Sequence, residues 1–266
     1  MAMPKLQVIG GGKMGEALLV GLVAGGWAPV GEVRAVEKLP GRAAELAQRF
    51  PGLDVGADVA PAAGHVLAVK PADVEGACQA LAGIGSTTPV LSIAAGVTVA
   101  RLEAALAPGT PVVRAMPNTP ALVGAGAAAV AAGSAAGEAD LAWAEEVLGA
   151  VGTVVRVEEG ALDAVTGLSG SGPAYVFLVA EALIEAGVLA GLSRPVSQAL
   201  ATRTLLGAAR LLDESPEGPE ALRAAVTSPG GTTAAGLRAL EAHGVRAAFM
   251  DAVMAATERS RELGAS

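Results

Sequence analysis

The sequence has few of the residues that build disulfides, thiolate metal clusters and aromatic stacking surfaces. Cysteine occurs once, at Cys78, and only 2% of the 266 residues are aromatic. One cysteine cannot form a disulfide or a cysteine metal cluster within the chain, so we expect a free structural thiol and no metal site. The few aromatic residues and the net charge of -8 also argue against a nucleic-acid partner, because the average surface field would repel phosphates.

The sequence also lacks a long uninterrupted apolar run and a secretory leader. Its most hydrophobic stretch, Pro173–Leu192, is interrupted by Glu181 and Glu185, which a membrane span would tolerate poorly. The first residues, Met1–Lys5, lead directly into a strand pattern without the regions of a signal peptide. We therefore expect a cytoplasmic protein with no membrane partner, whose 52% hydrophobic content builds a sizeable core.

Short apolar runs alternate with helical patterns through the first half of the chain, which is typical of a parallel sheet with crossover helices. The expected strands are 6–10, 33–37, 65–69, 90–93, 111–115, 127–130 and 153–157, and the expected helices are 15–24, 42–49, 74–81 and 138–148. After Glu159 only helical periodicity is left. The sequence predicts an α/β fold, with an N-terminal Rossmann-type parallel-sheet domain over residues 1–158 and an all-α dimerisation domain over residues 159–266.

The helix expected from Tyr175 to Ala190 is apolar on nearly all sides, so it must be buried on most of its surface. A helical domain of this size has little room to bury it. The pattern therefore predicts a homodimer formed through the helical half, and leaves open a larger assembly of dimers.

A glycine-rich turn follows the first expected strand and opens the first expected helix. Its pattern, Gly10-x-Gly12-x-x-Gly15, is a dinucleotide-binding fingerprint in that context. Glu37 ends the second strand, where an acidic residue holds the ribose 2′-hydroxyl, and this favours NADH. Lys38 and Arg42 are close enough in sequence to receive a 2′-phosphate, so NADPH stays open as the cofactor. The alternative interpretation of Glu37 is a solvated surface charge without a binding role.

The turns after two later strands should line the nicotinamide side, because ligands lie beyond the carboxyl ends of parallel strands. These turns are Ala68–Pro71 and Ser92–Gly96. Lys70 is a candidate hydrogen-bond donor to the cofactor, with a surface lysine at a strand end as the alternative.

A second glycine-rich segment, Thr227–Thr233, directly precedes the helical pattern Ala234–Ala242. Proline suits the first position of a helix, glycine lets backbone approach a ligand closely, and a helix N-terminus attracts anions. We interpret the segment as a carboxylate cradle without a fixed charge.

Five motifs together resemble the pyrroline-5-carboxylate reductase family over essentially the whole chain. They are the glycine fingerprint, Val69–Pro71, Met116–Pro120, Leu168–Tyr175 and Thr227–Thr233. The resemblance implies NAD(P)H-dependent reduction of the cyclic imine 1-pyrroline-5-carboxylate to L-proline, the last step of proline biosynthesis. One departure is Glu37, with Asp58 by a less secure alignment, where many NADPH-using members carry Ser, Arg or Asn.

The resemblance also implies a role for each set of site residues. The pyrophosphate would be bound by Gly10, Gly11, Gly12, Lys13 and Met14, and the nicotinamide and its ribose by Ala68, Val69, Lys70, Pro71, Ala94, Ala95 and Gly96. The substrate would be bound by Ser228, Gly230, Gly231, Thr232 and Thr233. Thr233 matches the hydroxyl that meets the ring nitrogen in the family.

Hydride transfer to an iminium carbon needs alignment more than a strong acid, so a neutral hydroxyl such as Thr233 is sufficient. Tyr175 is a second catalytic candidate, with a tyrosine packed at the dimer interface as the alternative. The two histidines, His65 and His243, start a strand and end a helix, and neither suits a general acid.

Two other functions compete with this interpretation. A β-hydroxyacid dehydrogenase would place a lysine on an interdomain helix, whereas the four lysines here all lie in the first domain, at Lys5, Lys13, Lys38 and Lys70. A regulatory protein that binds NAD(P) without turnover would not need the second anion site. Structural roles also remain open for two motifs: a rigid loop at Arg114–Pro120, and a helix cap with tight inter-subunit packing at Ser169–Pro173.

Overall fold

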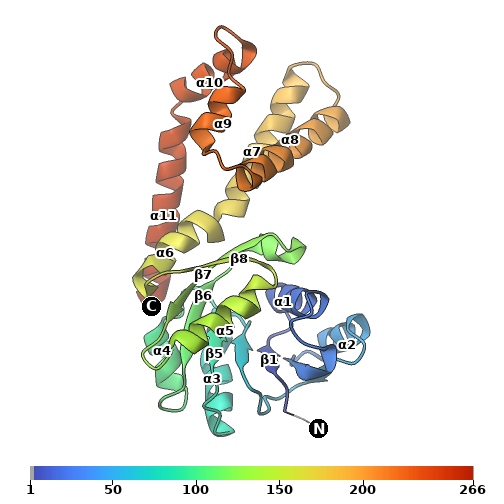
Figure 1. Ribbon diagram of the computed structural model, residues 1–266, viewed down its shortest axis with the longest axis vertical. Coiled ribbons are helices and arrows are strands. Elements are labelled where there is room, and N and C mark those ends of the chain that lie inside the picture. The colour runs from blue at the N-terminus through green and yellow to red at the C-terminus, as the bar shows by residue number, and fades with distance from the viewer. Residues whose placement is uncertain (1–2, 266) are drawn as a thin grey trace. The chain divides into compact units, whose positions relative to one another are not determined.

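The computed structural model describes residues 3–265 as two compact units (Figure 1). The first unit contains the residues up to Ser171 together with those from Met254 on, and the second contains Gly172–Val253. The strands end at Arg156, close to the domain boundary expected after residue 158. The two compact units divide after Ser171, which is later in the chain, so the boundary at residue 158 stays a prediction.

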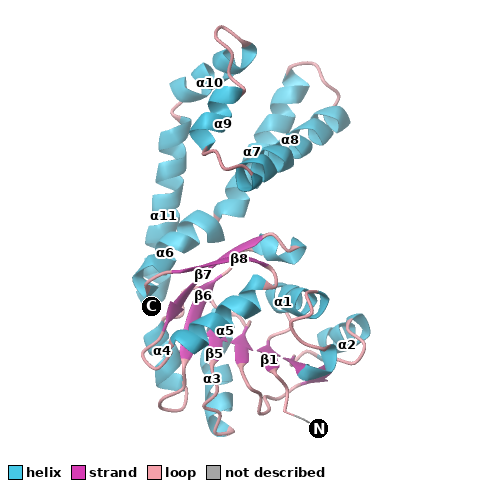
Figure 2. Cartoon of the chain, viewed as in Figure 1, coloured by secondary structure: helices cyan, strands magenta, loops and turns pink. Residues whose placement is uncertain are grey.

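The first unit is built on one eight-stranded sheet (Figure 2). Its strands, in chain order, are β1 (Leu6–Ile9), β2 (Val33–Val36), β3 (Asp54–Gly56), β4 (His65–Leu67), β5 (Val90–Ser92), β6 (Val112–Met116), β7 (Gly126–Ala132) and β8 (Gly152–Arg156). They lie in the order β3-β2-β1-β4-β5-β6-β7-β8. The order reverses between β1 and β4, which is the point where such sheets bind nucleotides.

The last two strands depart from the parallel pattern that the alternation indicated. The strands β3, β2, β1, β4, β5 and β6, which are neighbours in that order, are all parallel. Strand β7 is antiparallel to β6, with Met116 opposite Ala129. A short connection through the 3₁₀ turn η3 (Thr119–Val123) reverses the chain, since antiparallel neighbours need no crossover helix. Strand β8 then pairs in parallel with β7.

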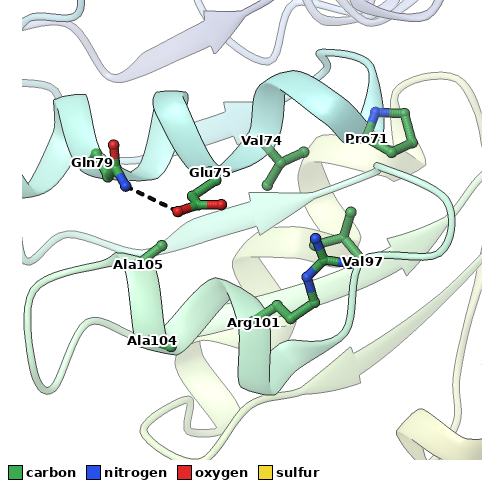
Figure 3. A pocket seen from close by; sticks show the side chains of 8 residues that line it. All are labelled: Pro71, Val74, Glu75, Gln79, Val97, Arg101, Ala104 and Ala105. Atoms are coloured by element: carbon green, nitrogen blue, oxygen red, sulfur yellow. Dashed lines mark hydrogen bonds between the residues drawn. The ribbon is translucent and has the colours of Figure 1, made fainter. Parts of the chain in front are cut away.

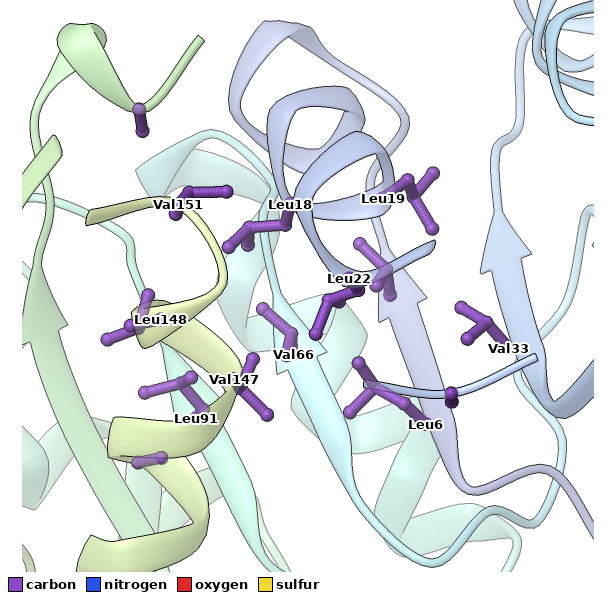
Figure 4. Close-up of a cluster of buried hydrophobic side chains, with 14 of the residues drawn as sticks. Leu6, Leu18, Leu19, Leu22, Val33, Val66, Leu91, Val147, Leu148 and Val151 are labelled. Atoms are coloured by element: carbon purple, nitrogen blue, oxygen red, sulfur yellow. The ribbon is translucent and has the colours of Figure 1, made fainter. Parts of the chain in front are cut away.

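Helices cover both faces of the sheet. They are α1 (Lys13–Ala24), α2 (Pro40–Arg49), α3 (Val74–Gly83), α4 (Val99–Ala105) and α5 (Glu138–Gly149). Leu18 of α1 and Val147 of α5 pack in one buried cluster with Val66 of β4 (Figure 4). The next residue, Leu67, belongs to the cluster on the other face with α3 and α4, because successive strand side chains point to opposite faces.

Cys78 lies in the cluster under α3 and is fully buried. Burial, with the nearby charge of Glu75, raises the pKa of its thiol to about 11. The thiol therefore stays protonated at neutral pH, as expected for a structural cysteine.

His65 belongs to a buried chain of hydrogen bonds. Its Nδ1 lies 3.1 Å from Gln7 Nε2, and its Nε2 lies 3.0 Å from Ser86 Oγ. Gln7 Oε1 accepts from the Ala60 amide, which orients the Gln7 amide group so that Nδ1 is the acceptor. Protonating Nδ1 would place two donors against each other, and burial already lowers the pKa of His65 to about 4.

We expect His65 to make the protein less stable in mild acid. Its pKa is lowered from 6.5 to about 4 on folding, so its contribution is fully present above pH 6.5 and is lost as the pH falls toward 4. The loss amounts to about 3 kcal/mol at 1.36 kcal/mol per pKa unit. Urea unfolding between pH 7 and 4 should show a shallower pH slope for His65→Gln than for the wild type. His243→Gln, at an exposed position, should keep the wild-type slope, and equal slopes for all three proteins would contradict the expectation.

The chain continues after β8 through a 3₁₀ turn, η4 (Glu159–Ala161), into helices only. These are α6 (Leu162–Val165), the π-helical turn η5 (Thr166–Gly170), α7 (Gly172–Leu189), α8 (Arg194–Glu214), α9 (Pro219–Ala225), α10 (Thr232–Ala242) and α11 (Val245–Ala265). Within the second unit, α7 and α8 pack closely, since Ser197 Oγ donates to the Ile184 carbonyl at 2.7 Å. A Cβ on Gly187 would overlap Ser197, so this contact requires glycine.

A single chain does not bury helix α7. None of its residues is buried, and Val176, Phe177 and Leu178 are more than half exposed. The stretch Glu159–Leu189 is even long and apolar enough to cross a membrane, judged by length and composition alone. The helix that was expected to be buried therefore needs a partner surface outside its own chain.

Candidate active site

The turn between β1 and α1 has the backbone that a dinucleotide fingerprint requires. Gly10 has a φ of +107°, and a Cβ there would lie 2.6 Å from the Ala68 carbonyl oxygen. A Cβ on Gly15 would overlap the Gly10 carbonyl oxygen, whereas one on Gly12 would meet nothing within 4 Å. No side chain caps the start of α1. Open space therefore lies directly at the positive end of a helix.

A cleft of about 660 Å³ extends from this turn along the carboxyl ends of β1, β2 and β4. It is lined by Ile9, Gly10, Gly12, Val36, Glu37, Lys38, Leu39, Arg42, Ala57, Asp58, Val59, Ala68, Val69, Lys70, Asp73, Gly76, Ala77 and Ala80. Its size suits a nucleotide. The cleft brings together residues that were predicted from three separate segments, and adds a wall from α3 that the sequence did not indicate.

Glu37 and Arg42 hold the backbone of Gly11 from both sides. Glu37 Oε2 accepts from the Gly11 amide at 3.1 Å, and Arg42 Nε donates to the Gly11 carbonyl at 2.7 Å. The other carboxylate oxygen of Glu37 accepts from the Leu39 amide at 2.9 Å. Glu37 is thus a fixed part of the cleft, and its oxygens keep lone pairs for further donors.

Arg42 is engaged by two further carboxylates. Its guanidinium pairs with Glu16 and with Glu45, and these hydrogen bonds raise its pKa. Glu16 also pairs with Arg49. Among the described residues that line the cleft, Arg42 is the one arginine, and its charge is balanced within the protein.

Most of the nicotinamide residues predicted after β4 and β5 line two hollows of the first unit, whereas Ala94 is buried in the cluster under α3 and α4. Val69 and Lys70 line the 660 Å³ cleft, whereas Ala95 and Gly96 line a second cavity of about 510 Å³. Gly96 has a φ of +72°, and a Cβ there would lie 3.6 Å from Leu263 Cβ of α11. The end of α11 therefore closes this cavity, a contribution that the sequence did not indicate.

A third hollow, of about 350 Å³, lies between α3 and α4 (Figure 3). Glu75, on its wall, accepts from Gln79 Nε2 at 3.1 Å, and Arg101 projects from α4. Of the predicted site residues only Pro71 reaches it. We assign it no part in the reaction.

In the second unit, Ser228–Gly231 form a tight turn before α10. The Gly231 amide donates to the Ser228 carbonyl at 3.1 Å, and Gly230 has a φ of +68°. Pro229 is therefore the second residue of a type II turn, and not the first residue of the helix as expected from sequence. Gly231 is the N-terminal cap, and no side chain caps the amides of the first turn. These amides point along the positive end of α10.

The two catalytic candidates have different surroundings within the second unit. Thr233, the second residue of α10, is exposed. Tyr175 is half-buried, and its hydroxyl lies 3.5 Å from the Ala252 carbonyl of α11. That contact gives Tyr175 a structural role that does not depend on any part in proton transfer.

Two buried polar residues lie in the segment Arg114–Pro120, for which the sequence suggested a rigid loop. Arg114 donates to Glu159 at 2.9 Å, and Glu159 also accepts from the first amide of α4, that of Val99. Asn118 bonds through both ends of its amide, to Ser169 and to Ala127. The signal for Asn118 was its place between two prolines at the end of a strand.

A glycine fingerprint at the reversal point of a parallel sheet, with an acidic residue fixed beside it, defines a dinucleotide-binding protein. The comparisons with known proteins narrow this class. Residues 159–263 match the family model described as "Pyrroline-5-carboxylate reductase dimerisation", and residues 5–96 match "NADP oxidoreductase coenzyme F420-dependent". The chain belongs to the pyrroline-5-carboxylate reductase family, the soluble NAD(P)H-dependent oxidoreductases of proline biosynthesis.

Relatives match over nearly the full length. The chain is 46% identical to a pyrroline-5-carboxylate reductase of Synechocystis, covering 98% of both chains, and 45% identical to one of Mycobacterium tuberculosis, covering 98% of this chain and 97% of the relative. A solved structure of the enzyme from Coxiella burnetii has a TM-score of 0.93 at 36% identity, with 98% of both chains covered. The dimerisation domain makes the chain a homodimer, and α7 its core helix.

Proposed function

We propose that this chain reduces 1-pyrroline-5-carboxylate to L-proline, with the cofactor on the first unit and the substrate on residues Ser228–Thr233 of the second. Bound NAD(P)H supplies the hydride. The observation that carries the substrate assignment is the uncapped N-terminus of α10 behind a glycine turn, in a chain that also has an open helix start at Gly12. One anion site fits a pyrophosphate and the other a carboxylate.

The substrate carboxylate would bind at the backbone amides of Gly230 and Thr232 and at Ser228. The Gly231 amide is already used by the turn, so its part is to bring the backbone close, since a Cβ there would overlap Ser228. Thr233 would present its hydroxyl to the ring nitrogen and orient or relay the proton. The cradle needs no charged side chain, because partial positive charge is supplied by the helix start.

The cofactor assignment keeps Gly10–Met14 for the pyrophosphate, and Ala68–Pro71 with Ala94–Gly96 for the nicotinamide ribose and ring. Within this assignment we propose that NADH is preferred over NADPH. Glu37 is held at the end of β2 with lone pairs free for ribose hydroxyls, and Asp58 adds a second carboxylate to the cleft wall. A 2′-phosphate would meet these carboxylates, and the charge of Arg42 is already balanced, which leaves Lys38 as the cation next to Glu37 that could receive it. A related structure from Plasmodium falciparum, 29% identical, contains NADP, so the preference is a property proposed for this chain.

Oxidation of NADH and NADPH, followed by absorbance with varied 1-pyrroline-5-carboxylate, tests this proposal. We expect kcat/KM to be at least tenfold higher with NADH, because opposed charges in the cleft disfavour the phosphate. Glu37→Ser should lower the ratio of kcat/KM with NADH to kcat/KM with NADPH by roughly tenfold. Glu32→Gln, at an exposed position outside the cleft, should leave this ratio unchanged.

Each outcome has a distinct meaning. An NADPH preference in the wild type would keep the reductase reaction and remove the role of Glu37. Cofactor binding without turnover of either nucleotide would favour the regulatory alternative.

We also propose that the homodimer works in the cytoplasm and can associate into larger assemblies. Exposed apolar side chains beyond α7, such as Leu200 and Leu211 of α8, support contacts over much of the helical unit. Light scattering across a concentration series would measure the assembly directly.

A further inference from the structure

Asn118 is a buried side chain with both ends of its amide bonded to backbone. Nδ2 donates to the Ser169 carbonyl at 3.1 Å, and Oδ1 accepts from the Ala127 amide at 2.9 Å. Asn118 is 9% exposed, so water has little access to replace these bonds. The side chain therefore ties the π-helical turn η5 to the sheet, beside the second residue of β7.

The Ser169 carbonyl needs an outside donor because of the residue four positions further on. In an α-helix this carbonyl would accept from the amide of residue 173, and that residue is Pro173, which has no N–H. The Asn118 amide supplies the missing donor. One hydrogen bond thus connects two motifs, Met116–Pro120 and Leu168–Tyr175, that the sequence could explain only separately.

The π-turn also packs directly against the residues before Asn118. A Cβ on Gly170 would lie 2.6 Å from Met116 Cε, so a larger residue there would displace the end of the Met116 side chain. Thr166 and Ser171, at the two ends of the turn, line the 510 Å³ cavity together with Ala95 and Gly96. The position of the π-turn therefore shapes a wall of the cavity on the nicotinamide side.

We propose that Asn118 is a positioning residue for the reductase reaction. By donating to Ser169 it fixes η5, and with it the wall that Thr166 and Ser171 give to the cavity beside Ala95 and Gly96. Asn118 acts through this wall and needs no contact with the substrate. The inference rests on the proposed placement of the nicotinamide at Ala94–Gly96.

Two variants of Asn118 test the bond itself. Asn118→Asp keeps the acceptor for Ala127 and loses the donor to Ser169, and Asn118→Ala loses both. We expect kcat to fall about tenfold in each, because misplacement of a supporting wall weakens alignment of the reactants. The dissociation constant for NADH should stay within twofold, since Gly10–Met14 are unaffected. The isotope effect with NADH deuterated at the transferred position should rise.

A readout independent of turnover accompanies these kinetics. The Ser171 amide donates to the Thr166 carbonyl at 2.8 Å, the bond that defines the π-turn. Its hydrogen exchange should become at least tenfold faster in Asn118→Asp. Thr119→Ala, at the exposed neighbouring position, should match the wild type in exchange and in kcat.

The decisive comparison repeats Asn118→Ala in a Pro173→Ala background. That substitution restores an amide four positions after Ser169 but not the acceptor for the Ala127 amide, so the part of the Asn118→Ala loss that comes from Ser169 should disappear and the loss should shrink to less than threefold. A defect of equal size in both backgrounds, or unchanged kcat and exchange in Asn118→Asp, overturns the proposal. If the wild type itself shows no turnover, the proposed function fails, while the exchange measurement still decides the role of Asn118.

Discussion

Gly15→Ala should destabilise the first unit and remove most of its affinity for NADH. The added methyl would overlap the Gly10 carbonyl oxygen, and a backbone atom cannot turn away as a flexible side chain can. Helix α1 would have to shift away from the β1 turn, at a cost of about 2–3 kcal/mol for overpacking. The shift also moves the helix N-terminus relative to Gly10, so we expect the dissociation constant for NADH to rise more than tenfold. Urea unfolding and fluorescence titration with NADH measure the two effects.

Gly12→Ala is the matched control, because a methyl there would meet nothing within 4 Å. We expect its unfolding free energy to stay within about 0.5 kcal/mol of the wild type, as for substitutions without a steric conflict. NADH binding should still weaken, since the methyl would occupy the space that the proposed site gives to the pyrophosphate. Equal stability of the Gly15 and Gly12 variants would show that the overlap at Gly15 is relieved without cost.

Thr233→Ala should lower kcat roughly 100-fold, the scale of a lost proton-transfer or orienting group in an active site. Thr233 is exposed and is not the N-terminal cap of α10, so the fold should remain intact. The substrate KM should change by less than fivefold, because in the proposed site the substrate carboxylate is bound by backbone amides and Ser228. Steady-state kinetics and a melting curve measure both properties.

Tyr175→Phe separates the two catalytic candidates. The Tyr175 hydroxyl is directed at the Ala252 carbonyl over 3.5 Å, a long hydrogen bond, so its removal should lower kcat less than threefold. If kcat of Tyr175→Phe instead fell more than tenfold at unchanged stability, and kcat of Thr233→Ala stayed close to the wild type, the role of proton carrier would be assigned to Tyr175.

The general fold and the family could be predicted because their signals are local in sequence. The strand, glycine turn and helix around Gly10 follow one another directly, and Glu37 comes at the end of the next strand. Pro229 was misplaced for a physical reason: the second residue of a type II turn and the first residue of a helix require the same φ, which proline satisfies equally. Only the positive φ of Gly230 distinguishes the two positions.

Other features could not be predicted because they depend on distant parts of the chain. Strand β3 has one apolar residue, Val55, and no buried residue, so it lacks the apolar run that marked the equally short β4 and β5, and α4 has only seven residues. The bond from Asn118 to Ser169 crosses 51 positions, and the packing of Leu263 against Gly96 crosses many more. No local pattern reports such contacts, although each shapes the site.

The place of Met254–Ala265 in the first unit has a consequence for synthesis on the ribosome. Ser260 donates to Asp163 at 2.6 Å, and Leu263 lies against Gly96, yet these residues are translated only after the whole of Gly172–Val253. A nascent chain can complete its sheet early but cannot close the cavity beside Gly96 until the second unit has been made. The first unit should therefore acquire its nucleotide affinity in two stages during translation, first at the glycine turn and later at the nicotinamide end.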